Sequence, residues 1–269
     1  DFGNEMKNLN SESFESVSIL RGAAASSLYG SRAANGVIVI TTKKGRKGTG
    51  IGVRISSSLT AEQVYAGPKF QNQYGAGVTS AFDKDTNGIN ILNPNTYRYS
   101  YGPAYDGTKV KDMDGRIIDW TPKPDNWKDL YQVGFNRNNL LELSGGADKS
   151  TYIFSYNNNY TEGILPRNSF KKDAFYFRGT HEFSKYLQLD ASINYTKTFS
   201  ENPLPQGGGA APLYWIAYNV PRNFDMNYWK DRYIDPVNGG ILRGAADPYG
   251  MASSLFNLYQ NTRTQAENN

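Results

Sequence analysis

Four segments between residues 139 and 199, three of them with several aromatic residues, alternate apolar and polar side chains, and this pattern limits the fold more than any other feature of the chain. In the last segment, residues 187–195, Leu, Ala, Ile and Tyr take every second position, while Gln, Asp, Ser and Asn take the others. A period of two is typical of a β-strand with one apolar face. We therefore predict strands over residues 51–60, 139–144, 151–161, 171–183 and 187–199.

The connections between these strands alternate in length. They are long over 61–138, short over 145–150, intermediate over 162–169, short over 184–186 and long again from about 200. Transmembrane β-barrels have short turns at one end and long loops at the other, and tilted strands of about 9–11 residues cross a bilayer. The apolar face would contact lipid, and the polar face would line an aqueous lumen. Because five strands cannot close a barrel, we expect a fragment of a longer polypeptide.

The composition agrees with a β-rich protein and excludes several kinds of site. The chain has 20 Tyr and 27 Gly, and only 20% of its residues are charged, as is typical of strands joined by many turns. It has no cysteine, which excludes disulfides and thiolate metal sites, and its one histidine is His181. The net charge is +4, and the basic residues form no cluster larger than KKGRK at 43–47. We predict no nucleic-acid partner and no cofactor.

A different texture precedes the first predicted barrel strand, in the stretch AAASSLYGSRAANGVIVITTKKG at residues 23–45. An Ala-rich run stopped by a glycine is typical of a short helix. A continuous β-branched run indicates a strand covered on both faces. We predict a strand over 13–20, a helix over 23–29, a turn over 31–36 and a strand over 37–42, which together form part of a compact α/β unit.

This stretch resembles the end of the plug domain of TonB-dependent outer-membrane transporters, and more narrowly their SusC/RagA branch from the Bacteroidetes. The matching residues are Leu20-Arg21, the Ala-rich helix, Tyr29-Gly30-Ser31-Arg32, Ala34-Asn35-Gly36, the apolar strand and Thr41 to Gly45. We predict structural roles for the motif residues Tyr29, Gly30, Arg32, Asn35 and Gly36. The glycines permit positive φ or close approach, and an arginine here could pair with a carboxylate or with backbone carbonyls.

The resemblance implies an energised importer in the outer membrane of a Gram-negative bacterium. Residues 1–48 would be the C-terminal part of the plug, and residues 49–269 would give the first strands and long extracellular loops of a 22-stranded antiparallel barrel. A TonB complex would pull on the plug, and a SusD-like lipoprotein would cover the extracellular face. The cargo would be an oligosaccharide or peptide too large for passive porins. The resemblance leaves open a dimer of transporter–lipoprotein pairs.

An aromatic cluster between residues 203 and 233 is the strongest candidate for ligand contact. We single out Tyr214, Trp215, Tyr228 and Trp229. Aromatic side chains combine a large contact area with a polar tip, which suits sugar faces and peptide backbones. The alternative is that these residues hold a folded loop together.

A second candidate is the run Asp83-Lys84-Asp85-Thr86-Asn87-Gly88, which resembles the start of a calcium loop. Asp83, Asp85 and Asn87 would be the ligands. The twelfth position, however, is Pro94 and not the glutamate that closes such a loop. We therefore predict a polar turn and no metal site.

Two other functional classes remain as alternatives to import. A non-transporting surface protein, such as an adhesin or binding scaffold, would have a polar outward face. A glycan hydrolase would need paired carboxylates on facing strands; Asp173 and Asp190 occupy candidate lumen positions, but nothing singles them out. Import makes and breaks no bond, so we predict no enzyme activity and no catalytic residue.

Overall fold

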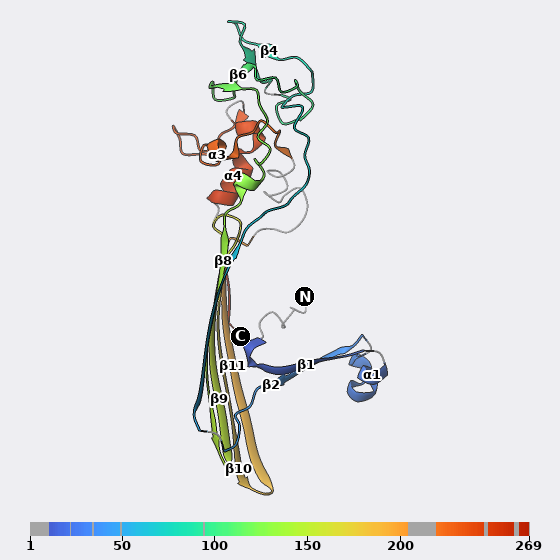
Figure 1. The fold of residues 1–269 in the computed structure, drawn as a ribbon, viewed down its shortest axis with the longest axis vertical. Helices are drawn as coiled ribbons and strands as arrows, with labels where there is room; N and C mark the ends of the chain where they lie inside the picture. The colour runs from blue at the N-terminus through green and yellow to red at the C-terminus, as the bar shows by residue number, and fades with distance from the viewer. Residues whose placement is uncertain are drawn as a thin grey trace.

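A computed structural model describes residues 11–21, 23–33, 35–48, 50–93, 95–203, 219–244, 247–260 and 264–268. Three parts follow one another in Figure 1: a tall sheet, a folded module at the upper end of the sheet, and an arm beside its lower half. None of the described helices has the length and apolar content that spanning a bilayer requires.

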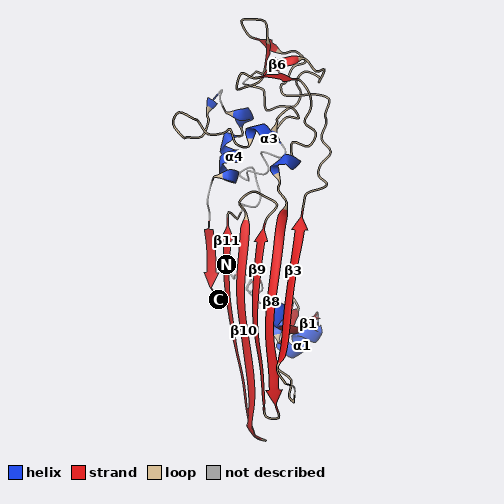
Figure 2. Ribbon diagram, turned by 60° about the vertical axis from the view of Figure 1, so that its left-hand side comes forward, coloured by secondary structure: helices blue, strands red, loops and turns tan. Residues whose placement is uncertain are grey.

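The tall sheet has six antiparallel strands in the order β12-β11-β10-β9-β8-β3 (Figure 2). Its strands are β3 (Gly52–Glu62), β8 (Gly134–Ala147), β9 (Ser150–Glu162), β10 (Ser169–Ser184), β11 (Leu187–Glu201) and β12 (Thr264–Asn268). The five predicted strands are therefore confirmed. β8 begins five residues earlier than the prediction, because residues 134–138 pair with β3 although they lack apolar alternation.

Direct partners across the sheet share a face, so the register fixes which side chains lie together. One row joins Val53, Leu143, Phe154, Phe177 and Ile193. The next row towards the folded module joins Ile55, Leu141, Tyr156, Phe175 and Tyr195. We call this side the outward face and the opposite side the inward face. Ile55 and Ile193 are 76% and 68% exposed, so the outward face is apolar and open.

The inward face is polar, and it carries only one of the two aspartates that we assigned to the lumen. Asp190 lies on it, directly opposite Thr180. The placement of Asp173 is wrong: it pairs in register with Asn158 and shares the outward face with Phe175. Its position two residues from Phe175 fixes that side, because side chains alternate along a strand.

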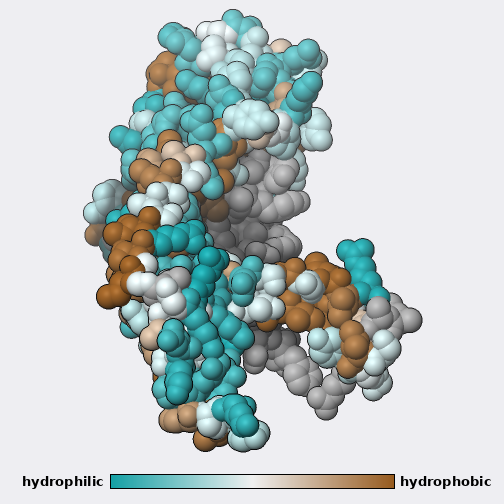
Figure 3. All heavy atoms as spheres, turned by 60° about the horizontal axis from the view of Figure 1, so that its bottom comes forward, coloured by the Kyte–Doolittle hydropathy of each residue, from teal (hydrophilic) through white to brown (hydrophobic). Residues whose placement is uncertain are grey.

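The arm consists of the hairpin β1 (Phe14–Leu20) and β2 (Val37–Thr42) with the helix α1 (Ala23–Tyr29) between them. Two short 3₁₀ turns, η2 (Ser11–Ser13) and η3 (Ser31–Ala33), complete it. Gly30 and Gly36 have φ values of 74° and 106°, as the motif predicts. The prediction that β2 is covered on both faces is wrong for the described residues, because none of its residues is buried and Ile38 is 45% exposed. Figure 3 shows this apolar surface along the arm.

The described residues of the two long connections fold together into one unit, which we call the loop module (residues 63–93, 95–133, 219–244 and 247–260). Its elements are β4 (Asp83–Lys84), β5 (Asn90–Ile91), β6 (Lys109–Lys111), β7 (Ile117–Asp119), η4 (Lys128–Leu130), α3 (Met226–Trp229), η6 (Pro248–Gly250) and α4 (Ala252–Tyr259). Trp120, Phe224 and Leu255 are fully buried in its core. Residues from both connections share this core, so each loop depends on the other for its structure.

Candidate functional site

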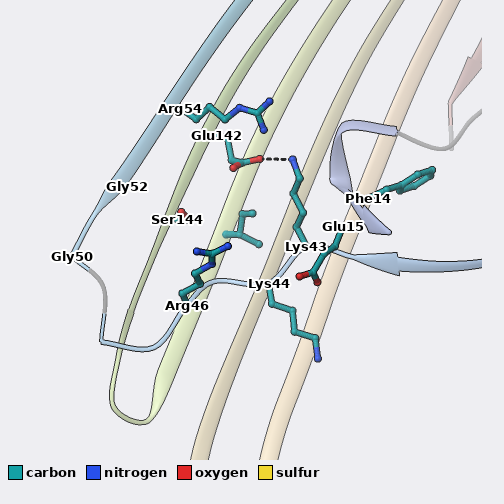
Figure 4. A pocket seen from close by; sticks show the side chains of 11 residues that line it. Phe14, Glu15, Lys43, Lys44, Arg46, Gly50, Gly52, Arg54, Glu142 and Ser144 are labelled. Atoms are coloured by element: carbon teal, nitrogen blue, oxygen red, sulfur yellow. Dashed lines mark hydrogen bonds and ion pairs between the residues drawn. The ribbon is translucent and has the colours of Figure 1, made fainter. Parts of the chain in front are cut away.

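The arm is joined to β3 by a segment that lies across the inward face of the sheet. We call residues 42–47 the junction segment. Figure 4 shows its course over the strands, with Lys43, Lys44 and Arg46 projecting from it. It crosses near the short turns that join β8 to β9 and β10 to β11.

Arg178 of β10 holds the first residue of the junction segment. Its Nε and Nη2 donate to the two carboxylate oxygens of Asp190 on β11, at 2.8 and 2.7 Å. Its Nη1 donates to Oγ1 and to the carbonyl oxygen of Thr42, at 2.7 and 3.3 Å. A guanidinium suits this task, because its planar fork engages a carboxylate at two points and still has a donor left.

The next residues continue the contact with other strands. Lys43 Nζ lies 2.9 Å from Oε2 of Glu142 on β8, and both side chains are largely buried. Tyr176 Oη donates to the carbonyl oxygen of Lys43 at 3.2 Å. Lys47 forms an ion pair with Glu182 near the turn. Charged pairs removed from water contribute more than exposed ones, so we expect Lys43–Glu142 to matter more than Lys47–Glu182.

Glycine is required where the junction segment lies flat on the sheet. A Cβ atom added to Gly45 would overlap the backbone N and O atoms of Tyr152. A Cβ atom added to Gly146 would overlap the carbonyl oxygen of Arg46. The two backbones therefore approach more closely than side chains would allow, which is the situation in which glycine is used.

A cavity of about 490 Å³ opens between the arm, the junction segment and the sheet. It is lined by Phe14, Glu15, Lys43, Lys44, Arg46, Gly50, Gly52, Arg54, Glu142, Ser144 and Ile153. Four of these residues are cationic and two are acidic, so the space between the arm and the sheet is a polar one. Figure 4 shows the Lys43–Glu142 bond across it.

The structure brings together two of the four aromatic residues predicted to contact ligand. The rings of Tyr228 and Trp229 lie 5.1 Å apart. Trp229 is 3% exposed and belongs to the core of the loop module. Its environment favours the alternative that it holds the loop together. Tyr214 and Trp215 lie outside the described residues.

Tyr228 lies at the rim of the same core, between two arginines. The guanidinium carbons of Arg116 and Arg232 lie 3.2 and 4.1 Å from its ring centroid. Its Oη donates to Asp114. These contacts engage the ring and its polar tip, so Tyr228 joins the turn between β6 and β7 to α3 in the described structure.

An open groove of about 470 Å³ on the loop module combines Trp127, a weaker aromatic candidate from the sequence, with Tyr65 and Phe70, which the sequence did not single out. Tyr65, Phe70 and Trp127 line it together with Asn72, Lys69, Pro68, Pro124, Asp125 and Lys128. Tyr65 is 84% exposed, whereas Trp127 is held beneath Gly67, where a Cβ atom would overlap the indole ring. The aromatic and proline residues at 65–70 were a signal, but only the fold brings residues 124–128 beside them.

The calcium-like run forms the turn that we predicted. Asp85 Oδ1 accepts from the backbone N–H groups of Asn87 and Ile89 at 2.9 and 3.0 Å. This carboxylate oxygen therefore stabilises its own loop, as aspartate does in many turns. Within the described ranges, no three His, Cys, Asp or Glu side chains could hold a metal ion together.

The five plug-motif residues lie on the arm. None of them lines the cavity at the junction segment or the groove around Tyr65. Tyr29 is 51% exposed, and Asn35 is also exposed. The side chain of Arg32 lies outside the described part of the chain. The structural roles of these residues therefore stay predictions, apart from the positive φ angles of Gly30 and Gly36.

Comparison with curated proteins finds TonB-dependent receptors. The chain is 25% identical over 262 residues to TonB-dependent receptor SusC of Bacteroides thetaiotaomicron, an alignment that covers 96% of this chain and 20% of that protein. It is 30% identical over 154 residues to TonB-dependent receptor P3 of Formosa agariphila, covering 56% of this chain and 12% of the relative. No protein-family model matches the chain.

Among solved structures, the RagAB peptide importer in its closed-closed state has a similar fold. The TM-score is 0.55 at 20% identity, over 87% of this chain and 26% of that chain. The predicted resemblance to SusC/RagA-like TonB-dependent transporters is confirmed. The open-open state of RagAB gives a TM-score of 0.52 at 22% identity. The SusC/RagA-like chain described here spans about a fifth of the length of SusC.

Proposed function

We propose that the chain belongs to a TonB-dependent importer of the outer membrane that takes up a large nutrient, either an oligosaccharide or a peptide. Residues 1–48 would be the C-terminal part of the plug. Residues 49–269 would be the first barrel strands with their long extracellular loops. The junction carries the proposal: an arm with the plug motif is held on the polar, inward face of a sheet whose outward face is apolar.

The two faces of the sheet support a membrane-spanning role over that of a soluble adhesin. An adhesin would present polar side chains outward, whereas Val53, Ile55 and Ile193 are each more than 60% exposed there. Such a face is stable next to lipid, and the polar inward face is stable next to water. The polar contacts of the junction segment would then lie inside the barrel.

The proposed partners would act at opposite ends of the barrel. A SusD-like lipoprotein would cover the loop module, where the groove around Tyr65 gives a surface for cargo. A TonB complex would pull on the plug from the end with the short turns. The junction segment would keep the plug attached to the barrel wall while the arm moves. Among the relatives, RagAB is named as a peptide importer, and a peptide is one of the two cargo classes proposed for this chain.

The proposal can be tested by fractionating the membranes of the native organism. We expect the full-length protein in the outer-membrane fraction, and we expect affinity capture to recover a surface lipoprotein with it. Growth of a deletion strain on defined oligosaccharides and on peptides, with and without TonB, then distinguishes the cargo classes. Recovery as a soluble protein, or cargo uptake that continues without TonB, would contradict the proposal.

A further inference from the structure

The outward face changes from apolar to polar along its register rows towards the loop module. After the row of Tyr156 and Phe175 comes a row that joins Ser57, Asn139, Asn158, Asp173 and Lys197. The following row joins Leu59, Arg137, Tyr160, Lys171 and Phe199. We call the rows of Val53 and Ile55 the apolar band. The two polar rows face the same side as this band, so the surroundings that contact the band also contact these polar groups.

Most polar groups in this region satisfy one another. Asp173 Oδ1 accepts from Tyr156 Oη at 2.8 Å and from Asn158 Nδ2 at 2.7 Å. Its other oxygen lies 3.3 Å from Lys171 Nζ. Ser57 Oγ donates to Asn139 Oδ1 at 2.8 Å. A network of this kind lowers the cost of placing polar groups beside hydrocarbon, and it marks the boundary of the apolar band.

Two cations in these rows remain without an ion pair among the described residues. Arg137 is exposed, and its guanidinium carbon lies 5.9 Å from the centroid of the Tyr160 ring. Lys197 is exposed and lies opposite Asp173 in the register, but that carboxylate already bonds Lys171, Tyr156 and Asn158.

Asp173 lies in the row of Lys197, and two further carboxylates on this face lie beyond the row of Arg137. Glu162 and Glu201 flank Ser169 there. Glu201 accepts from Ser169 Oγ at 3.3 Å, and Glu162 accepts from Gln132 Nε2 at 3.4 Å. Asp173 is already bonded to its neighbours, so the two cations without an ion pair lie between the apolar rows and the two glutamates.

We infer that Arg137 and Lys197 bind anionic lipid headgroups in the leaflet next to the loop module. The inference rests on the proposed function, because it requires the sheet to be embedded in a membrane. Two exposed cations without an ion pair, just beyond the apolar rows, are complementary to a leaflet in which hydrocarbon is followed by phosphate. Three strand spacings separate β8 from β11, roughly 14 Å, so the two cations would contact different headgroups. The Tyr and Phe side chains of the same rows suit this interface.

The test uses the full-length protein in nanodiscs that contain phosphatidylglycerol and phosphatidylcholine in equal amounts. The lipids that stay bound after gentle extraction are counted by native mass spectrometry. We expect the protein to retain phosphatidylglycerol preferentially. The variant R137Q/K197Q should lose at least about fivefold of this preference, since one cation near an anionic leaflet changes binding by roughly that factor.

A matched control removes the same charges from the other side of the sheet. Arg54 and Lys172 face inward, so R54Q/K172Q should keep the preference. Equal loss in both variants, or no loss in R137Q/K197Q, would overturn the inference. If inorganic phosphate competes with phosphatidylglycerol at equal concentration, the site binds free phosphate and not a lipid. Failure to insert into nanodiscs would contradict the proposed function itself.

Discussion

Arg178 and Asp190 form a two-point ion pair between β10 and β11, and the remaining nitrogen of Arg178 binds Thr42 at the end of the arm. One side chain thus joins two strands of the wall to the segment that leaves the plug-like arm. In the proposed importer, this arrangement separates the part of the chain that moves from the part that stays on the wall.

Replacing Arg178 by lysine should loosen the junction segment. A lysine keeps the charge but cannot engage Asp190 at two points and Thr42 at the same time. A hydrogen bond to a charged group contributes about 1.5–3 kcal/mol, so amides of residues 42–47 should exchange about 10–100 times faster in hydrogen–deuterium exchange. R54K is the control, because Arg54 has no ion pair within the described residues. Unchanged exchange in R178K would show that other contacts suffice.

Replacing Gly45 by alanine should lift the junction segment from the sheet. The added Cβ would overlap backbone atoms of Tyr152, and backbone cannot yield as a flexible side chain can. Protease cleavage within residues 43–48 should therefore increase. The variant G50A changes the same linker where nothing lies within 4 Å of the new atom, and it should resemble the wild type. Equal cleavage of G45A and G50A would contradict the close approach.

An arginine at position 193 should impair insertion into the membrane. Ile193 is 68% exposed on the outward face, and a cation at the bilayer midplane costs about 2–4 kcal/mol. The folded fraction in lipid vesicles, measured by heat-modifiable gel mobility, should fall. The control Q188R places the same charge on the inward face of β11, opposite Glu182, and should fold normally. If both variants fold equally well, the assignment of faces is wrong.

Acidification should weaken the contact between Asp114 and Tyr228. Burial alone would raise the pKa of Asp114, but hydrogen bonds from Tyr228 and Arg116 outweigh it and lower the pKa below its usual value. The unfolded state therefore binds more protons in this range, so the contribution is present above about pH 4 and is lost as pH falls through the folded-state pKa. Hydrogen exchange of α3 should rise below pH 4 in the wild type. In D114N the exchange rate of α3 should not rise below pH 4. An equal rise in D114N would show that another group titrates there.

Replacing Arg222 by methionine should stabilise the loop module or leave its stability unchanged. Arg222 is 2% exposed, its two terminal nitrogens have no hydrogen-bond partner among the described residues, and burial lowers its pKa to about 10. An unsatisfied buried donor costs about 1–3 kcal/mol. The stacking of the guanidinium on Phe70, at 4.3 Å from the ring centroid, offsets part of this cost. The thermal unfolding midpoint of the loop module should not fall. The control R232M removes a partnered arginine from the surface and should lower this unfolding midpoint. A large fall of the midpoint in R222M would show that Arg222 has a stabilising partner.

Local patterns in the sequence determined the elements of the arm and five strands of the tall sheet, but not the elements of the loop module or β12. The helix over 23–29 and the strand over 37–42 have the predicted bounds, because an Ala-rich run before glycine and a β-branched run each favour one backbone conformation. Period-two alternation likewise placed Ile193 outward. The alternation fades over residues 134–138 of β8, so no boundary could be predicted there, and pairing with β3 extends the strand.

Only the tertiary structure decided which distant residues meet. The contacts of the junction segment join residues 99 to 136 positions apart, and Asn223 accepts from the backbone of Ala76 across 147 positions. The same folding buries Trp229, which the sequence alone could place either in a ligand site or in a core. Such choices depend on which surfaces exclude water together, and periodicity along one strand or loop carries no information about its partners.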